Sequence, residues 1–148
     1  MKKFTGIIIV FLLIFSLIGC DKYIRDNSPG SITEITLDES LELAKEEKES
    51  IILYSITTCN DCIKLKEVLN NYLKNHSVEI NEVVLDNEGT TDEEIQSNRR
   101  KINTIFSEFN AVPSMYYLKD GKVIDEAIEI TTEEELDEWV LKNMLDKK

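Results

Sequence analysis

Apolar and polar residues change their spacing abruptly in the middle of the chain. Residues 50–56, SIILYSI, are almost continuously apolar, which is typical of a strand covered on both faces of a sheet. Directly after them, apolar side chains recur at helical steps of three and four: Cys62, Leu65, Leu69, Tyr72 and Leu73. The pattern predicts a central strand that leads directly into an amphipathic helix, with Cys62 on the inner face and Cys59 at the start.

Upstream of this strand, the pattern predicts a short strand and a helix. Residues 32–36, ITEIT, offer Ile32 and Ile35 as the apolar positions of a first strand. Asp38 can cap a helix that runs to about residue 48. The inner side of that helix is predicted to carry Leu41, Leu43 and Ala44.

Downstream, the alternation continues with a strand and a helix. Residues 78–86, VEINEVVLD, predict another strand. Thr91 or Asp92 then starts a helix. The inner face of this helix is predicted to consist of Ile95, Ile102, Ile105 and Phe106.

The last part of the chain predicts a hairpin and a terminal helix. Two strands, residues 114–118 and 122–127, are joined through Asp120 and Gly121, which favour a two-residue turn because both tolerate positive φ. Thr132 and Glu135 have the spacing of a capping box. The helix that follows is predicted to bury Leu136, Trp139, Val140 and Met144. The order of elements predicts one α/β domain over residues 32–148.

The first twenty residues have a different character. Lys2 and Lys3 precede an apolar run, and residues 4–19 carry no charge and are fewer than the roughly 20 that a membrane-spanning helix needs. This layout is typical of a secretory signal peptide over residues 1–19, although an uncleaved membrane anchor is an alternative. The run ends in Leu-Ile-Gly-Cys, which resembles the bacterial lipobox, so Cys20 is expected to be lipidated; an ordinary cysteine is the alternative.

The following residues, up to residue 31, mix charge with Asn, Ser, Pro and Gly and show no periodicity. They predict a lipidated tether over residues 20–31. At about 3.3 Å per extended residue, such a tether would let the domain stand a few tens of ångströms from a membrane.

Size and charge narrow the classes of function. A chain of 148 residues suffices for one domain, and 42% hydrophobic with 31% charged residues is typical of a globular protein. The formal net charge of -12 argues against a nucleic-acid partner, because phosphate binding needs a basic surface. We expect a monomer.

The cysteine count favours a functional pair. If Cys20 carries lipid, Cys59 and Cys62 remain as a Cys-x-x-Cys pair in an exported protein, where disulfides persist. A structural zinc site wants four nitrogen or sulfur ligands, and only His76 would be left to join the pair. No metal and no cofactor are therefore expected, while an inert structural disulfide remains an alternative to a redox centre.

The predicted position of Cys59 suits redox chemistry. Unpaired N–H groups at a helix start stabilise a thiolate, which is the reactive form of cysteine. Cys62, one turn later, could displace a substrate from a mixed disulfide. Asp61 is predicted to oppose thiolate formation by its charge, unless it caps the first-turn N–H groups instead. Asn60 and Asp61, between the two thiols, are therefore the candidate tuning residues.

The order of elements resembles thioredoxin. The resemblance covers residues 32–148 and is carried by IILYSITTCNDC, AVPSMYYLKDGKV and the amphipathic C-terminal helix. It implies a three-layer α/β/α fold with a central mixed sheet, Cys59 as the attacking thiol and Cys62 as the resolving thiol. It also implies a cis peptide bond between Val112 and Pro113, beside the cysteines, where an extended substrate could pair as an added strand.

Some positions depart from the thioredoxin pattern. Thr58 stands where the family has a tryptophan, and together with Val112 and Pro113 it is expected to contact the substrate. The buried acidic residue of the family falls at Leu53, and the segment between Asp86 and Pro113 is longer. With its lipobox, the chain looks more like the thioredoxin-like lipoproteins and bacteriocin-accessory thiol oxidoreductases of bacteria.

The sequence therefore predicts a thiol-disulfide oxidoreductase, lipid-anchored on the extracytoplasmic side of a bacterial cell membrane. Its expected partners are exported proteins with thiols or disulfides, a membrane or soluble redox partner, and the membrane itself through Cys20. Oxidation, reduction and isomerisation all stay open. The alternative is a lipoprotein of the same fold that tethers a partner at the membrane without turnover.

Overall fold

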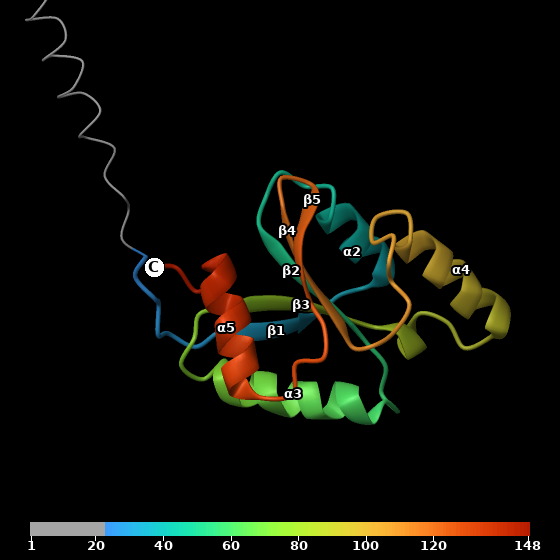
Figure 1. The fold of residues 1–148 in the computed structure, drawn as a ribbon. Coiled ribbons are helices and arrows are strands. Elements are labelled where there is room, and N and C mark those ends of the chain that lie inside the picture. Colours follow the sequence, from blue (N-terminus) through green and yellow to red (C-terminus); the bar gives the residue numbers. More distant parts are fainter. Residues whose placement is uncertain (1–22) are drawn as a thin grey trace, which may run out of the picture.

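The computed structural model describes residues 23–148 and contains a five-stranded sheet between two layers of helices (Figure 1). The predicted signal peptide and Cys20 lie outside the described residues. Within residues 23–148, no helix has the length and apolar character needed to cross a bilayer.

The sheet is mixed, as predicted. Its strands are β1 (Ser31–Glu34), β2 (Ser50–Ser55), β3 (Glu79–Val84), β4 (Ser114–Lys119) and β5 (Lys122–Ala127). They lie in the order β1-β3-β2-β4-β5. Strands β1 and β2 each pair with β3 in parallel orientation, whereas β4 is antiparallel to both β2 and β5. The almost continuously apolar β2 occupies the centre, where both of its faces are covered.

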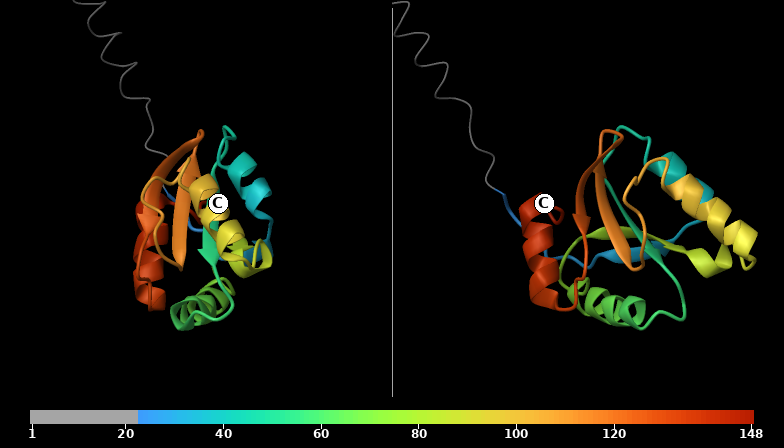
Figure 2. Two further views of the ribbon diagram at one scale, coloured as in Figure 1. Left: turned by 90° about the vertical axis from the view of Figure 1, so that its right-hand side faces the viewer. Right: turned by 45° about the vertical axis from the view of Figure 1, so that its right-hand side comes forward.

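Helices cover both faces of this sheet. They are α2 (Leu37–Leu43), α3 (Asn60–Tyr72), α4 (Asp92–Ile102) and α5 (Glu133–Asn143), with a short 3-10 helix, η1 (Leu85–Asn87). Figure 2 shows α5 on one side of the sheet and α2 and α4 on the other, while α3 lies beside α5. The three-layer α/β/α arrangement implied by the resemblance to thioredoxin is therefore confirmed.

Alternation along β2 produces two separate cores. Ile51 and Leu53 pack with residues of α3 and α5, whereas Ile52 and Tyr54 pack with residues of α2 and with those near the end of α4. Side chains of a strand point alternately to opposite faces, so one apolar run serves both cores. This packing fixes the end of β2, from which Cys59 follows.

Three of the predicted helix starts are observed, and one is corrected. Thr91 and Thr132 each cap a helix through a capping box, as Cys59 caps α3 with its thiol. The helix predicted to begin at Asp38 is instead capped by Thr36, with Glu39 completing the box. It ends at Leu43 rather than near residue 48. The residues that follow Ala44 are charged up to β2, so another turn would bury no apolar side chain.

Two residues predicted to lie on inner faces are exposed. Ile95 is 47% exposed because it lies in the first turns of α4, and only Ile102 of that helix is buried. Met144 is 54% exposed because the chain leaves α5 there in a left-handed conformation, with φ 54°. Helical spacing alone places a residue on one side of a helix; it does not tell how far the neighbouring layer extends.

The turn between β4 and β5 is the predicted one. Asp120 has φ 51° and Gly121 has φ 70°, as a two-residue hairpin turn with two left-handed positions requires. The hairpin places β4 next to β2 in the sheet. It thereby holds the segment that precedes β4 close to the start of α3.

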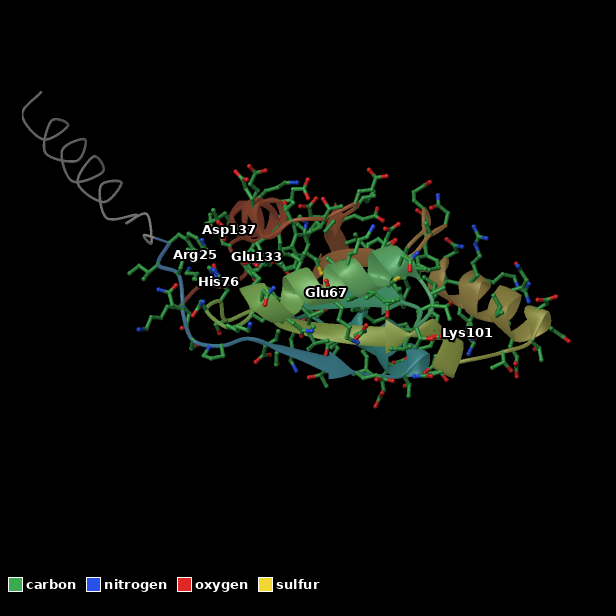
Figure 3. The ribbon with its side chains drawn as sticks, turned by 90° about the horizontal axis from the view of Figure 1, so that it is seen from below. Arg25, Glu67, His76, Lys101, Glu133 and Asp137 are labelled. Atoms are coloured by element: carbon green, nitrogen blue, oxygen red, sulfur yellow. The ribbon has the colours of Figure 1, made fainter. Side chains whose placement is uncertain are left out.

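The first described residues are docked on the domain. Arg25 donates from Nη2 to Asp137 at 2.5 Å and forms an ion pair with Asp146 at 2.8 Å, and Tyr23 also donates to Asp146. Figure 3 shows Arg25 beside His76 and Asp137. The folded part therefore begins no later than Tyr23, not at residue 32. Tyr23 and Arg25, which fall within the predicted tether, thus contact the folded domain.

Asp146 is central to this docking. Its side chain is fully buried, and burial by itself raises its pKa. Hydrogen bonds from Tyr23, Arg25 and His76 outweigh the effect of burial and hold the pKa of Asp146 below its usual value. The buried carboxylate stays charged because hydrogen bonds, including one from the positively charged Arg25, replace its hydration.

Candidate active site

Cys59 lies at the N-terminus of α3, directly after the loop that follows β2. Its backbone is extended, with φ -85° and ψ 119°, and its thiol is the N-cap group of the helix. The Sγ atom accepts a hydrogen bond from the backbone N–H of Cys62 at 3.2 Å. A thiolate at this position is stabilised by the unpaired N–H groups of the first turn and by the helix dipole. The structure therefore places Cys59 at the helix mouth, as the sequence predicted.

The two thiols have opposite environments. Cys59 is partly exposed, whereas Cys62 is only 6% exposed. A hydrogen bond from the Cys62 thiol, together with N–H groups of Cys62 and Asp61, lowers the pKa of Cys59 despite partial burial. Burial, and then the hydrogen bond to Cys59, raise the pKa of Cys62 to about 12. The pair thus combines a more easily ionised thiol at the surface with a buried thiol that is protonated at neutral pH.

Asp61 has only a minor effect on the pKa of Cys59. Its carboxylate is exposed and pairs with Lys64 at 3.1 Å. The charge of Asp61 does raise the pKa of Cys59, but it is the smallest of the contributions, and the backbone N–H of Asp61 acts in the opposite direction. The charge of Asp61 acts in the predicted direction, and the net pKa of Cys59 is lowered because the hydrogen bonds at the helix start outweigh it. Thr58 and Asn60 are exposed on either side of Cys59, and their roles stay predictions.

The peptide bond between Val112 and Pro113 is cis, as predicted. The carbonyl oxygen of Val112 lies 3.7 Å from the Sγ atom of Cys59, which can donate to it. The loop before β4 therefore lies against the start of α3, although the two are far apart in the sequence. The contribution of Val112 and Pro113 to substrate binding stays a prediction.

Asp86 holds the loop before Cys59 in place. The backbone N–H of Thr57 donates to the Asp86 carboxylate at 3.0 Å, and the Thr57 hydroxyl donates to it as well. These bonds lower the pKa of Asp86, with the hydroxyl contributing most. No local sequence pattern predicts this contact, because the two residues are 29 positions apart. The parallel strands β2 and β3 end at the same edge of the sheet, so residues just after them can meet there.

A buried carboxylate that was not predicted from the sequence lies beneath the cysteines. Glu82 of β3 is 3% exposed and accepts hydrogen bonds from Ser55 at 2.8 Å and from Lys66 at 2.7 Å. Glu82, Lys66 and Cys62 line a common cavity of about 210 Å³. Leu53, where the acidic residue of thioredoxin was expected, pairs with Glu82 on the neighbouring strand. A glutamate among the apolar residues of a central strand was the available signal.

No resident metal site is built by the described residues. In residues 23–148, no group of three or more His, Cys, Asp or Glu side chains is arranged to hold a metal ion. His76 stacks on Tyr72, with ring centroids 3.9 Å apart, and its ring nitrogen lies 3.1 Å from Asp146. It therefore belongs to the docking of the N-terminal segment and lies apart from the cysteines.

No protein-family model and no curated protein matches the chain. Solved structures do. A thioredoxin from Aeropyrum pernix is 19% identical, with a TM-score of 0.55, over 82% of this chain and 97% of its own. Desulfothioredoxin from Desulfovibrio vulgaris Hildenborough, in its reduced form, is 19% identical, with a TM-score of 0.56, over 76% of this chain and 98% of its own.

A mutant thioredoxin from Halobacterium salinarum is similar as well. It is 14% identical, with a TM-score of 0.56, over 82% of this chain and 96% of its own. Each of these proteins is matched along almost its whole length. The chain therefore has the thioredoxin fold.

Proposed function

We propose that this chain is a thiol-disulfide oxidoreductase in which Cys59 is the nucleophile and Cys62 the resolving thiol. The observation that carries the proposal is the unequal thiol pair at the start of α3. Cys59 has a lowered pKa and partial exposure, while Cys62 is buried, with a pKa of about 12. An inert structural cysteine pair would need neither the difference in pKa nor access for the first thiol.

In the first step, the Cys59 thiolate attacks one sulfur of a substrate disulfide. The substrate S–S bond breaks, its second sulfur leaves as a thiolate, and a mixed disulfide forms between Cys59 and the substrate. The N–H group of Cys62 that bonds the Cys59 sulfur keeps the attacking atom at the helix mouth. The carbonyl oxygen of Val112 borders the same position.

In the second step, Cys62 loses its proton and attacks the Cys59 sulfur. The substrate leaves as a thiolate, a Cys59–Cys62 disulfide forms, and two electrons have passed from the pair to the substrate. The cavity that Cys62 shares with Glu82 is large enough for water, and it offers the proton a path towards a buried carboxylate. Run in reverse, the same exchanges insert a disulfide into a dithiol substrate.

Turnover separates this proposal from a tethering protein without activity. The reduced full chain, at catalytic amounts and with a dithiol in excess, is expected to reduce insulin disulfides over many cycles. Insulin chain precipitation and consumption of the dithiol are the measurements. A burst of one disulfide per chain with no further reaction would contradict the proposed enzyme and favour the binding protein.

We also propose that the domain is held on the extracytoplasmic face of a bacterial membrane, as a monomer, by lipid on Cys20. The basic start, the apolar run and the Leu-Ile-Gly-Cys end support this location. Its substrates would then be exported proteins with thiols or disulfides, and a membrane or soluble dithiol protein would restore the pair. With Tyr23 docked on the domain, the spacer after Cys20 is short, so the domain would stay close to the membrane surface.

Cys20→Ala is expected to abolish incorporation of labelled fatty acid and to block maturation, because no other cysteine is available next to the apolar run. Metabolic labelling followed by gel electrophoresis is the measurement. Cys59→Ala is the matched control and should be labelled like the parent. Lipid incorporation that persists in Cys20→Ala would contradict the anchor.

A further inference from the structure

A second and larger cavity lies beside the candidate active site. It has a volume of about 310 Å³ and lies between η1, α4 and the loop before β4. Figure 1 shows these segments together at the end of the sheet that is remote from the C-terminus. The apolar residues that line it are Ile56, Leu85, Ile95, Ile102, Phe109 and Val112. A cavity of this size and lining is typical of a binding site for an apolar group.

This cavity adjoins the cysteine site through one shared residue. Val112 lines it, and the carbonyl oxygen of the same residue lies 3.7 Å from the Sγ atom of Cys59. Asp86, also in the lining, holds Thr57 of the loop that leads to Cys59. A polypeptide whose sulfur is bonded to Cys59 would therefore pass the mouth of the cavity within a few residues of its cysteine.

Two side chains of α4 distinguish the mouth of the cavity from an ordinary surface. Ile95 is 47% exposed on a helix that is otherwise mostly charged or polar. Arg99, one helical turn further on, also lines the cavity and forms no ion pair within residues 23–148. In a chain of net charge -12, an unpaired arginine beside an apolar cavity attracts a ligand that carries an acidic group.

We propose that this cavity is a substrate pocket that binds a bulky apolar side chain close to the reacting cysteine of a polypeptide, while Arg99 pairs with a neighbouring acidic residue. The proposal rests on the proposed function, because the substrate is the polypeptide exchanging its disulfide with Cys59. The chemistry is unchanged: the reduced protein and a peptide disulfide yield two substrate thiols and the Cys59–Cys62 disulfide. The pocket selects which polypeptide reacts.

The test uses synthetic peptides that carry one cysteine as a mixed disulfide with thionitrobenzoate. Phe or Ser is placed at each of three positions on either side of the cysteine, and release of yellow thionitrobenzoate in a single turnover of the reduced full chain gives the second-order rate constant. Phe at one of these positions is expected to raise this rate constant about tenfold over Ser, as burial of an apolar group does. A Glu next to that Phe should raise it several-fold more than a Lys, and salt should reduce this difference.

Variants of the pocket test its location. Ile95→Asp is expected to bring the ratio of Phe to Ser rates close to one, because a carboxylate then lies at the apolar mouth. Ile124→Asp is the matched control, since Ile124 is similarly exposed on β5, away from the cavity, and it should keep the ratio. Arg99→Glu should reverse the preference between Glu and Lys, whereas Arg100→Glu, at the neighbouring position outside the lining, should not.

The outcomes separate the pocket from the proposed function. Equal rates for Phe and Ser peptides at all positions would overturn the proposed pocket. That result is expected if a second copy of the chain or the apolar segment of residues 7–18 fills the cavity, or if nothing binds there. Equal losses of the ratio in Ile95→Asp and Ile124→Asp would overturn it as well. Failure to reduce the small reagent bis(2-hydroxyethyl) disulfide would instead overturn the proposed function. Reduction of that reagent without a peptide preference would remove only the pocket.

Discussion

Replacement of Cys62 by serine is expected to leave the protein covalently bound to its substrates. The first exchange needs only Cys59, whose pKa is lowered, so the mixed disulfide still forms. The second exchange needs a thiol in the position of Cys62, and a serine hydroxyl cannot displace a sulfur in its place. Bands of higher mass on a non-reducing gel, removed by reductant, are the measurement.

Cys59→Ser is expected to lower turnover at least about a thousandfold and to trap nothing, because it removes the nucleophile itself. The remaining thiol, Cys62, is buried and has a pKa of about 12, so it is almost entirely protonated at neutral pH. The double variant Cys59→Ser/Cys62→Ser is the control for non-specific binding. Equal trapping by the two single variants would contradict the assigned order of the thiols.

Lys66→Met is expected to lower the free energy of unfolding by about 2–3 kcal/mol, because it leaves the buried Glu82 carboxylate without its cation. Lys66 bonds Glu82 at 2.7 Å, and the other bond to that carboxylate comes from the Ser55 hydroxyl. The Lys66 side chain is 46% exposed, which keeps the expected loss at the lower end for a buried ion pair. Urea unfolding of the full chain is the measurement.

Two further variants test this explanation. Lys45→Met removes an ion pair of similar length, 2.8 Å, in which both side chains are exposed, and it should change stability by about 0.5 kcal/mol or less. Lys66→Met combined with Glu82→Gln should regain most of the loss, because no uncompensated charge is left in the interior. If Lys66→Met and Lys45→Met have the same free energy of unfolding, the ion pair with Glu82 does not stabilise the protein.

The cysteine pair was the part of the site that could be predicted best. Cys59 and Cys62 are three residues apart, so a single turn of helix decides their relative positions, and the apolar spacing after them determines which one is buried. The predicted effect of the Asp61 charge on the pKa of Cys59 has the expected direction but is outweighed. Its carboxylate is exposed and paired with Lys64, while N–H groups at the helix start act on Cys59 from closer range.

Glu82 and Ile95 show where sequence patterns are insufficient. From the sequence, a glutamate in β3 is expected to be exposed. Only the structure shows that β2, α3 and Lys66 surround it. Ile95 has the spacing of a core residue, but the neighbouring layer does not extend far enough to cover it. In both cases, burial depends on elements that are distant in the sequence.

By itself, the sequence determined the order and kind of the elements, most of the helix starts, the hairpin turn and the cysteine pair at the mouth of a helix. These features depend on periodicity, capping and turn chemistry, which involve residues within a few positions of one another. Only the tertiary structure decided which distant segments meet. It brings Val112 to Cys59 across 53 positions and Arg25 to Asp146 across 121 positions. Such contacts arise from the strand order and the packing of whole layers, which no local pattern encodes.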